Sequence, residues 1–380
     1  MKALQLVEMD APRTNTHRAW TREALRRIEA ETQQSVRTPL IKLPLPQFRN
    51  VTVYAKDESV HVTGSLKHRL ARSLFVQALC NGEIGPDTVI IEASSGSTAV
   101  SEAYFAALIG LPFIAVVPAH TSAEKLRMIE HYGGRCHTVE EASAVTTEAQ
   151  RLATECGGYF IDQFTNAATA TDWRTANIAE EVHEQLRLSE NPVPSWVVVG
   201  AGTGGTSTCF ARHARYRGYD TRVAVVDPDG SAFFEGWRQN DRSVRTTTPS
   251  RIEGIGRTQV EPSFYPELID RMIHVPDAAS IATMRWFSRL LGRRVGASTG
   301  TNLWGTLLLA QELEQSGEAT SLVTLICDSG DRYVSTYYND DWLTTQGIDV
   351  RTYASMLTEF EGAGQLKRTD TSDCTVSAAE

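Results

Sequence analysis

The stretch that decides the fold is Trp196–Thr206, which reads WVVVGAGTGGT. Its apolar start predicts a buried strand, and residues 207–216 after it can form a helix. Glycines allow a sharp turn and leave backbone N–H groups open to a ligand, while the helix adds the positive end of its dipole. The plain interpretation is a tight turn between a strand and a helix. Four glycines and two threonines in seven residues exceed what a turn requires, so they favour a phosphate-binding loop.

Outward from this stretch, segments with strand and helix patterns alternate along the chain. Further strands are predicted at residues 51–56, 88–93, 113–117, 135–139, 159–162, 222–226, 272–276 and 322–327. This alternation predicts right-handed βαβ units and parallel sheets, and therefore an α/β fold. With 380 residues and 41% hydrophobic content, the chain is long enough for two domains.

The segments at the ends and near the middle of the chain are harder to interpret. Residues 1–15 are expected to be irregular, and 16–34 to form an amphipathic helix that packs as an arm. Residues 172–188 are predicted to form one continuous helix. Residues 364–380 are polar and rich in small side chains, which predicts a frayed tail.

Composition excludes several classes of function. A formal charge of −9 argues against nucleic-acid binding. The most apolar window, residues 103–118, is short and interrupted by Gly110 and Pro112, so no membrane span is expected. No secretory signal is evident at the N-terminus. Six cysteines without a CxxC pair predict neither a metal site nor a disulfide framework, and favour the cytoplasm.

A lysine is expected at the start of a second notable helix. Gly64 and Ser65 predict a turn and a helix cap, and Asn81-Gly82 predicts the end of the helix. Lys67 lies in the first turn, where the helix dipole opposes its charge and lowers its pKa. Most lysines are solvated surface charges, but a lysine with a lowered pKa can act as a nucleophilic amine.

A hydroxyl-rich loop, Ser94–Thr98, follows the strand predicted at 88–93 and precedes an apolar helix that reaches Ile109. Serine and threonine are common helix caps, so capping alone could explain the loop. Four hydroxyl groups at a helix N-terminus favour a bound carboxylate or phosphate instead.

The phosphate loop allows two interpretations. Gly200, Gly202 and Gly205 match the dinucleotide fingerprint, and Asp227 lies where an acid that binds ribose is expected. That interpretation leaves Lys67 and the hydroxyl-rich loop without a function. A lysine, a carboxylate loop, a glycine loop for one phosphate and a serine at a strand end together match a pyridoxal-phosphate site.

Taken jointly, these motifs resemble the fold-type II pyridoxal-phosphate enzymes of the cysteine synthase and cystathionine β-synthase group, over roughly residues 36–340. The resemblance implies two domains, each with a twisted, mostly parallel sheet flanked by helices, as in tryptophan synthase β. It also implies pyridoxal 5′-phosphate as the cofactor and an amino acid as the substrate. A homodimer is expected on the same ground.

The resemblance also implies the roles of individual residues. Lys67 would be the catalytic residue, forming the Schiff base with the cofactor and then removing the Cα proton. The phosphate cradle would be formed by Gly202, Thr203, Gly204, Gly205 and Thr206. The substrate carboxylate would be bound by Ser94, Ser95, Gly96 and Thr98, with the help of Gln163. Gly254 would lie on a mobile loop facing the active site, and Ser329 would meet the pyridine nitrogen. Ser97, near the cofactor O3′, stands where the family usually has asparagine. No haem site and no regulatory nucleotide-binding module are expected.

Four parts of the chain are predicted on this basis. Residues 1–35 form an N-terminal arm, and 36–167 form an α/β domain that carries the Schiff-base lysine and the carboxylate loop. Residues 168–345 form an α/β domain that carries the phosphate loop. Residues 346–380 form a C-terminal helix and a flexible tail.

The predicted reaction is β-elimination. A serine at the pyridine nitrogen makes the ring a weaker electron sink than an aspartate would, which favours loss of a β-substituent through an aminoacrylate over transamination. Residues 63–74, 92–105, 251–257 and 298–305 resemble L-cysteine desulfhydrases, which release sulfide, pyruvate and ammonia from cysteine. One alternative is a β-replacement synthase that makes cysteine, cystathionine or a diamino acid from an activated serine. Another is a regulatory protein that holds the cofactor without turnover.

Overall fold

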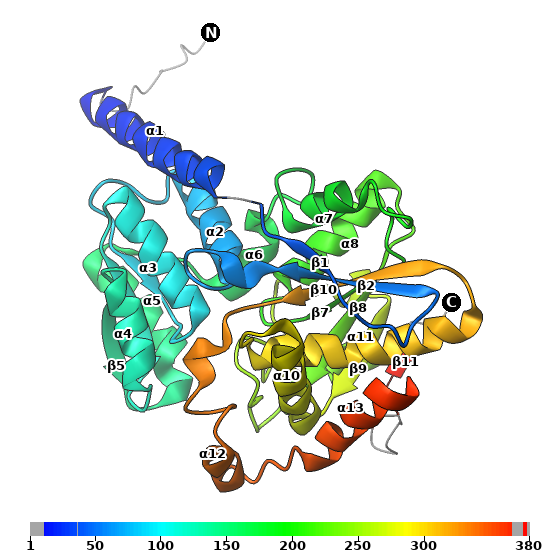
Figure 1. Cartoon of the computed structure of the whole chain (residues 1–380). Helices are drawn as coiled ribbons and strands as arrows, with labels where there is room; N and C mark the ends of the chain where they lie inside the picture. Colours follow the sequence, from blue (N-terminus) through cyan, green and yellow to red (C-terminus); the bar gives the residue numbers. More distant parts are fainter. Residues whose placement is uncertain (1–10, 36, 367–374, 378–380) are drawn as a thin grey trace. The chain divides into compact units, whose positions relative to one another are not determined.

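The computed structural model describes residues 11–35, 37–366 and 375–377 (Figure 1). They form two compact units, each with its own sheet. Unit 1 comprises the described part of Met1–Val36 together with Ala71–Asp162. Unit 2 comprises Arg37–Leu70 and the described part of Gln163–Glu380. The chain passes from unit 2 to unit 1 within the helix α2 (Lys67–Asn81) and returns after Asp162.

The sheet of unit 2 has seven strands in the order β1-β2-β10-β7-β8-β9-β11. Their bounds are β1 Leu40–Lys42, β2 Val51–Asp57, β7 Trp196–Gly200, β8 Arg222–Pro228, β9 Arg271–Val275, β10 Thr320–Ile326 and β11 Thr375–Ser377. The five inner strands run parallel, and the edge strands β1 and β11 pair antiparallel with their neighbours.

Helices cover both faces of this sheet (Figure 1). One face packs against α7 (Ile178–Leu186), α8 (Gly205–Arg217) and α9 (Phe233–Gln239). The other packs against α10 (Asp277–Leu291), α11 (Ala297–Ser316) and α13 (Arg351–Ala363). Val197 and Val199 lie in the first core and Val198 in the second. Burial on both faces is the reason that β7 is apolar at every position rather than at alternate ones.

Unit 1 contains a four-stranded, fully parallel sheet in the order β5-β4-β3-β6. The strands are β3 Ile90–Glu92, β4 Phe113–Pro118, β5 Arg135–Val139 and β6 Tyr159–Phe160. Its helices are α1 Ala11–Gln34, α3 Ser97–Ile109, α4 Ala123–His131, α5 Val145–Cys156 and most of α2. Parallel sheets flanked by helices in both units confirm the predicted fold class.

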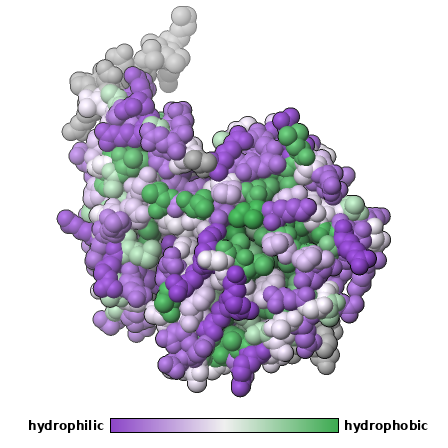
Figure 2. All heavy atoms as spheres, viewed as in Figure 1, coloured by the Kyte–Doolittle hydropathy of each residue, from purple (hydrophilic) through white to green (hydrophobic). Residues whose placement is uncertain are grey.

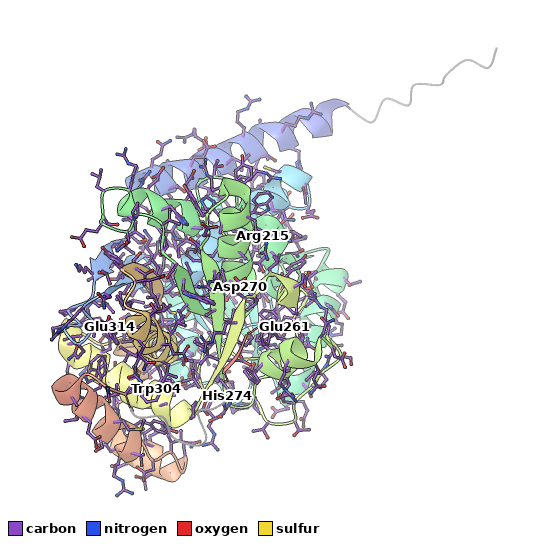
Figure 3. All side chains as sticks on the ribbon, turned by 90° about the vertical axis from the view of Figure 1, so that its right-hand side faces the viewer. Arg215, Glu261, Asp270, His274, Trp304 and Glu314 are labelled. Atoms are coloured by element: carbon purple, nitrogen blue, oxygen red, sulfur yellow. The ribbon has the colours of Figure 1, made fainter. Side chains whose placement is uncertain are left out.

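Residues 37–70 belong to unit 2, whereas the predicted domain 36–167 places them with the N-terminal sheet. The reason is long-range pairing, because β2 pairs with β10 along its full length. The carboxylate of Glu314 at the end of α11 also accepts the backbone N–H groups of Arg49, Asn50 and Val51 at 2.9–3.3 Å. Figure 3 labels Glu314 and Trp304 along this helix. A local sequence pattern carries no signal for such a pairing.

Three local predictions are also corrected. Helix α1 begins at Ala11 rather than residue 16, and residues 1–10 lie outside the described residues. Residues 172–188 are not one helix, because α7 begins at Ile178, where the Asn177 side chain accepts the N–H groups of Ala179 and Glu180. The tail is not frayed throughout, since β11 pairs with β9. The remaining tail residues 367–374 and 378–380 lie outside the described residues.

Hydrophilic and hydrophobic residues are intermixed on the side shown in Figure 2. Large apolar side chains that are exposed include Val60 and Val62, which lie in one segment, and Leu188 and Val334, which lie in two others. None of the described helices combines the length and the apolar character that crossing a membrane requires.

Candidate active site

The candidate site lies at the carboxyl edge of the parallel strands of unit 2. The strand registers align Asp57 of β2 with Ile326 of β10, and Gly200 of β7 with Val226 of β8. The chain segments that leave these strands therefore begin along one edge of the sheet, which is where ligands bind in open α/β sheets. They include the turn before Lys67, the segment that contains Ser329, and the glycine loop.

The turn before Lys67 is attached to the end of β10. Leu66 donates its backbone N–H to the carbonyl of Cys327 at 2.8 Å, and Ser329 donates its N–H to the carbonyl of Gly64 at 3.0 Å. Gly64 adopts a positive φ of 72°, and the Ser65 hydroxyl accepts the N–H of Lys67 at 3.2 Å. The predicted turn and cap are confirmed, and Lys67 is the first residue of α2.

Lys67 occupies an environment that disfavours its charge. Burial lowers the pKa of its amine, while the nearby Cys327 and Asp328 act in the opposite direction. The sequence attributes a lowered pKa to the helix dipole, but removal from water is the largest cause. An amine with a lowered pKa is neutral for a larger fraction of the time, and the neutral form is the nucleophile.

The glycine loop between β7 and α8 is tightly enclosed. Gly204 caps α8 with a φ of 87°, and Thr203 Oγ1 accepts the N–H of Gly205 at 3.2 Å. A Cβ at Gly204 would lie 2.5 Å from the Cα of Phe264. A Cβ at Gly202 would collide with the carbonyl oxygen of Gly254. The structure thus brings together Gly202 and Gly254, two residues predicted for the site from distant parts of the sequence.

Gln163 lies on a helix next to this loop. It is buried and is the first residue of α6 (Gln163–Ala170). A Cβ at Gly205 would lie 3.1 Å from the Cβ of Ala167, so α6 packs against the start of α8. Gln163 therefore belongs to the same unit as the glycine loop and opens a helix adjoining it.

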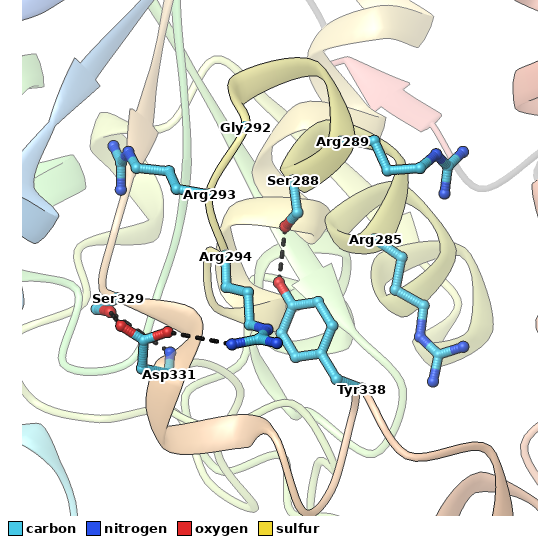
Figure 4. Close-up of a pocket in the computed structure, with 9 residues that line it drawn as sticks. All are labelled: Arg285, Ser288, Arg289, Gly292, Arg293, Arg294, Ser329, Asp331 and Tyr338. Atoms are coloured by element: carbon cyan, nitrogen blue, oxygen red, sulfur yellow. Dashed lines mark hydrogen bonds and ion pairs between the residues drawn. The ribbon is translucent and has the colours of Figure 1, made fainter.

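Ser329 lies directly after β10 and caps the short helix η4 (Gly330–Tyr333). Its hydroxyl donates to Asp331 Oδ2 at 3.2 Å, a contact drawn in Figure 4. The preceding residue, Asp328, is buried, and its Oδ2 accepts the hydroxyl of Tyr333 at 2.6 Å. Burial raises the pKa of the Asp328 carboxyl, and its Oδ1 has no hydrogen-bond partner among the described residues.

Sequence reasoning missed Asn302, which connects the end of β10 with the glycine loop. Asn302 is buried within α11 and donates from Nδ2 to Leu325 O at 3.3 Å and to Cys327 Sγ at 3.2 Å. Its Oδ1 has no partner among the described residues and would lie 3.2 Å from a Cβ at Gly200. An asparagine among the apolar residues of a predicted helix was the available signal.

In unit 1, the hydroxyl-rich loop also follows a parallel strand. It leaves β3, Ser94 Oγ accepts the N–H of Gly96 at 3.3 Å, and α3 begins at Ser97. Ser95 lies within this turn, and Thr98 is buried in the first turn of the helix. The predicted loop at a helix N-terminus is confirmed.

Two buried acids flank this loop in the sequence. Glu92 ends β3 and Glu102 lies on α3, and neither side chain is exposed. Burial and the neighbouring Glu92 raise the pKa of Glu102 well above its usual value. Both carboxyl oxygens of Glu102 lack a hydrogen-bond partner among the described residues. This environment favours the protonated form of Glu102.

Asp227 does not suit the ribose role that a dinucleotide site would give it. Its side chain is fully buried, its Oδ2 accepts the N–H of Phe234 at 2.8 Å, and burial raises its pKa to about 7. An acid that binds ribose needs an accessible, charged carboxylate. Among the described residues, no group of three or more His, Cys, Asp or Glu side chains is arranged to hold a metal ion.

The residues of unit 2 fit pyridoxal phosphate instead. Backbone enclosed on two sides precedes the N-terminus of α8, and the start of a helix offers an anion backbone N–H groups and the positive end of the dipole. A lysine amine with a lowered pKa and a serine hydroxyl lie along the same strand edge. The glycine loop suits the phosphate of this cofactor, the lysine amine suits its aldehyde, and the serine hydroxyl suits its ring nitrogen.

Comparisons with known proteins agree with this fit. The sequence pattern of the family described as "Pyridoxal-phosphate dependent enzyme" matches residues 32–328. The chain is 57% identical over 349 residues to L-cysteine desulfhydrase Cds1 of Mycobacterium tuberculosis, covering 90% of this chain and 95% of that protein. It is 31% identical to a putative cysteine synthase of Sinorhizobium fredii, covering 83% of this chain and 92% of that protein. The crystal structure of O-ureido-L-serine synthase matches with a TM-score of 0.72 and 26% identity, over 83% of this chain and 98% of that chain.

The chain belongs to the pyridoxal-phosphate dependent enzymes. Its cofactor is pyridoxal 5′-phosphate, and its fold is that of the fold-type II enzymes of this class.

Proposed function

We propose that this enzyme is a lyase that performs β-elimination on L-cysteine. Cysteine and water give sulfide, pyruvate and ammonia. The observation that carries the proposal is the 57% identity to an L-cysteine desulfhydrase over nearly the full length of both chains. This sequence identity extends over 90% of the chain and is higher than the 31% identity to the putative cysteine synthase.

The residues that would hold the cofactor are assigned from the resemblance to the family. Lys67 binds the cofactor aldehyde covalently. The segment Gly202–Thr206 binds the phosphate through backbone N–H groups and the dipole of α8. Ser329 would meet the pyridine nitrogen, and Ser97 would lie near O3′. Bound pyridoxal phosphate supplies the electron sink that withdraws charge from the substrate Cα.

The remaining steps belong to residues of this chain. Lys67 would remove the Cα proton, and its lowered pKa leaves more of its amine neutral and able to accept that proton. Ser94, Ser95, Gly96 and Thr98 bind the substrate carboxylate, and Gln163 assists. Ser329 is neutral and cannot stabilise a full positive charge on the ring nitrogen. The site therefore favours expulsion of the β-thiolate over a long-lived Cα carbanion, and hence elimination over transamination.

The test is an assay with L-cysteine alone, in which sulfide and pyruvate are both measured. Equal amounts of the two products are expected. Lys67→Ala is expected to lower the rate at least about 10³-fold, since it removes both the covalent anchor and the base. It should also remove the absorbance band of the covalently held cofactor. Sulfide that forms only when a second nucleophile is added would contradict elimination.

The alternative function is β-replacement. The similarity to a putative cysteine synthase and to O-ureido-L-serine synthase supports it. It predicts a new amino acid from an activated serine and an added thiol. A regulatory protein without turnover would form no product from any β-substituted amino acid.

We further propose a cytoplasmic homodimer. The five cysteines that the structure describes carry free thiols, which suits a reducing compartment. Light scattering on the purified protein tests the dimer.

A further inference from the structure

A cavity of about 610 Å³ opens in unit 2 beside Ser329. It lies between the C-terminal end of α10, the residues that follow this helix, and the segment around η4 (Figure 4). Four arginines line it: Arg285, Arg289, Arg293 and Arg294. The only carboxylate in the lining is Asp331, and Ser288 and Tyr338 add hydroxyls. The volume is that of a small-molecule site, and the charged lining suits a polar anion.

Two of the arginines have donors to spare. Arg285 donates from Nε to the carbonyl of Tyr337 at 2.8 Å and from Nη1 to Asp340 at 2.5 Å. Its Nη2 is buried and has no partner among the described residues. The exposed side chain of Arg289 forms no hydrogen bond or ion pair within the described part of the chain. A buried guanidinium N–H without an acceptor is costly, and a shift of the Arg285 side chain toward the cavity would let an anionic ligand supply that acceptor.

The other two arginines are engaged to different degrees. Arg293 donates hydrogen bonds to Asp57 Oδ2 at 2.5 Å and to Ser59 Oγ at 2.9 Å, so we assign it no contact with the ligand. Arg294 lies 3.6 Å from Asp331, which is an ion pair too long for a hydrogen bond. One cation near the end of α10 would suffice to offset the helix dipole. The spare donors on Arg285 and Arg289 exceed that requirement.

We propose that this cavity binds a small oxyanion with two or more negative charges, of the phosphate, diphosphate or polycarboxylate kind. We infer further that the bound anion acts on the cofactor through Arg294, Asp331 and Ser329. The binding stands on the cavity itself, whereas this coupling rests on the proposed role of Ser329 at the ring nitrogen.

The coupling follows from a competition for one proton. Ser329 has a single hydroxyl hydrogen, which it donates to Asp331 Oδ2 at 3.2 Å. While Arg294 stays near Asp331, its positive charge partly offsets the negative charge of this carboxylate and makes it a weaker hydrogen-bond acceptor. An anion that recruits Arg294 leaves Asp331 a stronger acceptor, and the Ser329 hydroxyl is then held away from the ring nitrogen. Bound anion is therefore expected to change the absorbance and fluorescence of the cofactor.

The experiment is calorimetric titration of the fully loaded enzyme with inorganic phosphate, pyrophosphate or citrate, at an ionic strength held constant with sodium chloride. Loading with cofactor keeps phosphate out of the glycine loop. Arg289→Gln and Arg285→Gln are each expected to weaken binding at least tenfold. The matched control is Arg238→Gln, which neutralises an exposed arginine on α9 that pairs with Glu235, and its affinity should equal that of the parent. Comparison of the three anions distinguishes a phosphate site from a polycarboxylate site.

Asp331→Asn separates the two parts of the proposal. It should still bind the anion, but the change in the cofactor spectrum should disappear. Equal affinity in the parent, Arg289→Gln and Arg285→Gln, or no binding of any of the three anions, would overturn the site. A spectral change that survives Asp331→Asn would overturn the coupling alone. Sulfide release without added anion is measured on Arg289→Gln in parallel, so that failure of the proposed function is seen separately.

Discussion

Two loops of this molecule each follow a parallel strand and open a helix, but they are built from different residues. The glycine loop, residues 200–206, leaves β7 and opens α8 in unit 2, and the serine loop, residues 94–98, leaves β3 and opens α3 in unit 1. In the glycine loop, added Cβ atoms at Gly202 and Gly204 would strike neighbouring backbone. In the serine loop, a Cβ at Gly96 would meet nothing within 4 Å.

The difference teaches how each loop can bind an anion. The glycine loop offers backbone N–H groups whose directions are set by packing, which suits a cofactor phosphate that stays in place. The serine loop offers hydroxyls that rotate, which suits a substrate carboxylate that enters and leaves at each turnover. The glycine loop adjoins the amide of Asn302, whereas the serine loop is flanked by the buried acids Glu92 and Glu102. Four substitutions test the contrast.

Gly204→Ala is expected to have the largest effect. Alanine is disfavoured at a φ of 87°, and its Cβ would lie 2.5 Å from the Cα of Phe264, so backbone must move. We expect the free energy of unfolding to fall by about 2–4 kcal/mol, with most of the bound cofactor lost. Urea denaturation and cofactor absorbance measure the two effects. A variant as stable as the parent would show that the loop is not rigidly enclosed.

Gly202→Ala is expected to act more on cofactor affinity than on the fold. The added methyl group collides with the carbonyl of Gly254, which lies in the segment between α9 and β9. Displacing the segment would open the phosphate site, and we expect pyridoxal phosphate to bind about 10–100-fold more weakly, or about 1.4–2.8 kcal/mol. Fluorescence titration of the cofactor-free protein measures this affinity. Unchanged affinity would contradict the assignment of the phosphate to this loop.

Glu102→Gln tests the acid beside the serine loop through the pH dependence of stability. The folded-state pKa of Glu102 is raised, so the folded protein keeps a proton that the unfolded chain releases above about pH 4.5. Stability is therefore lost as the pH rises from there toward the folded pKa, by up to about 1.4 kcal/mol per pH unit. Glutamine does not titrate and escapes this loss.

The glutamine variant should thus resemble the parent at pH 5 and be more stable at pH 8, as measured by urea denaturation at both values. Glu141→Gln, at an exposed position of unit 1, is the matched control and should show no such gain. A parent and Glu102→Gln with parallel pH profiles would mean that Glu102 does not stay protonated in the folded protein.

Gly96→Ala is expected to have the smallest effect on stability. Its φ of −108° is accessible to alanine and the space around a Cβ is open, so the change in unfolding free energy should stay within about 0.5 kcal/mol. If the loop binds the substrate carboxylate, the methyl group should raise KM for cysteine with little change in cofactor content. Loss of cofactor in this variant would place the loop on the phosphate rather than on the substrate.

Much of the molecule could be predicted because the signals are local. The apolar run of β7 and the glycines after it predict a buried strand and a tight turn, and both are present. The cap at Ser65 is a local contact, because the Ser65 hydroxyl accepts the backbone N–H of Lys67 only two residues later. Predictions failed where the deciding contact is distant, as for residues 37–70, whose strand pairs with β10 some 270 positions later.

The sequence by itself determined the α/β class, the two loops that open α3 and α8, and the lysine at the start of α2, because strand period, glycine content and helix capping depend on neighbouring residues. Only the tertiary structure decided which groups meet at the strand edge. It brought Gly254 onto Gly202, inserted Asn302 between β10 and the glycine loop, and placed Arg285 and Arg289 around a cavity beside Ser329. These contacts depend on long-range strand pairing and helix packing. Pairing and packing bring together segments that are far apart in the sequence and share no sequence pattern.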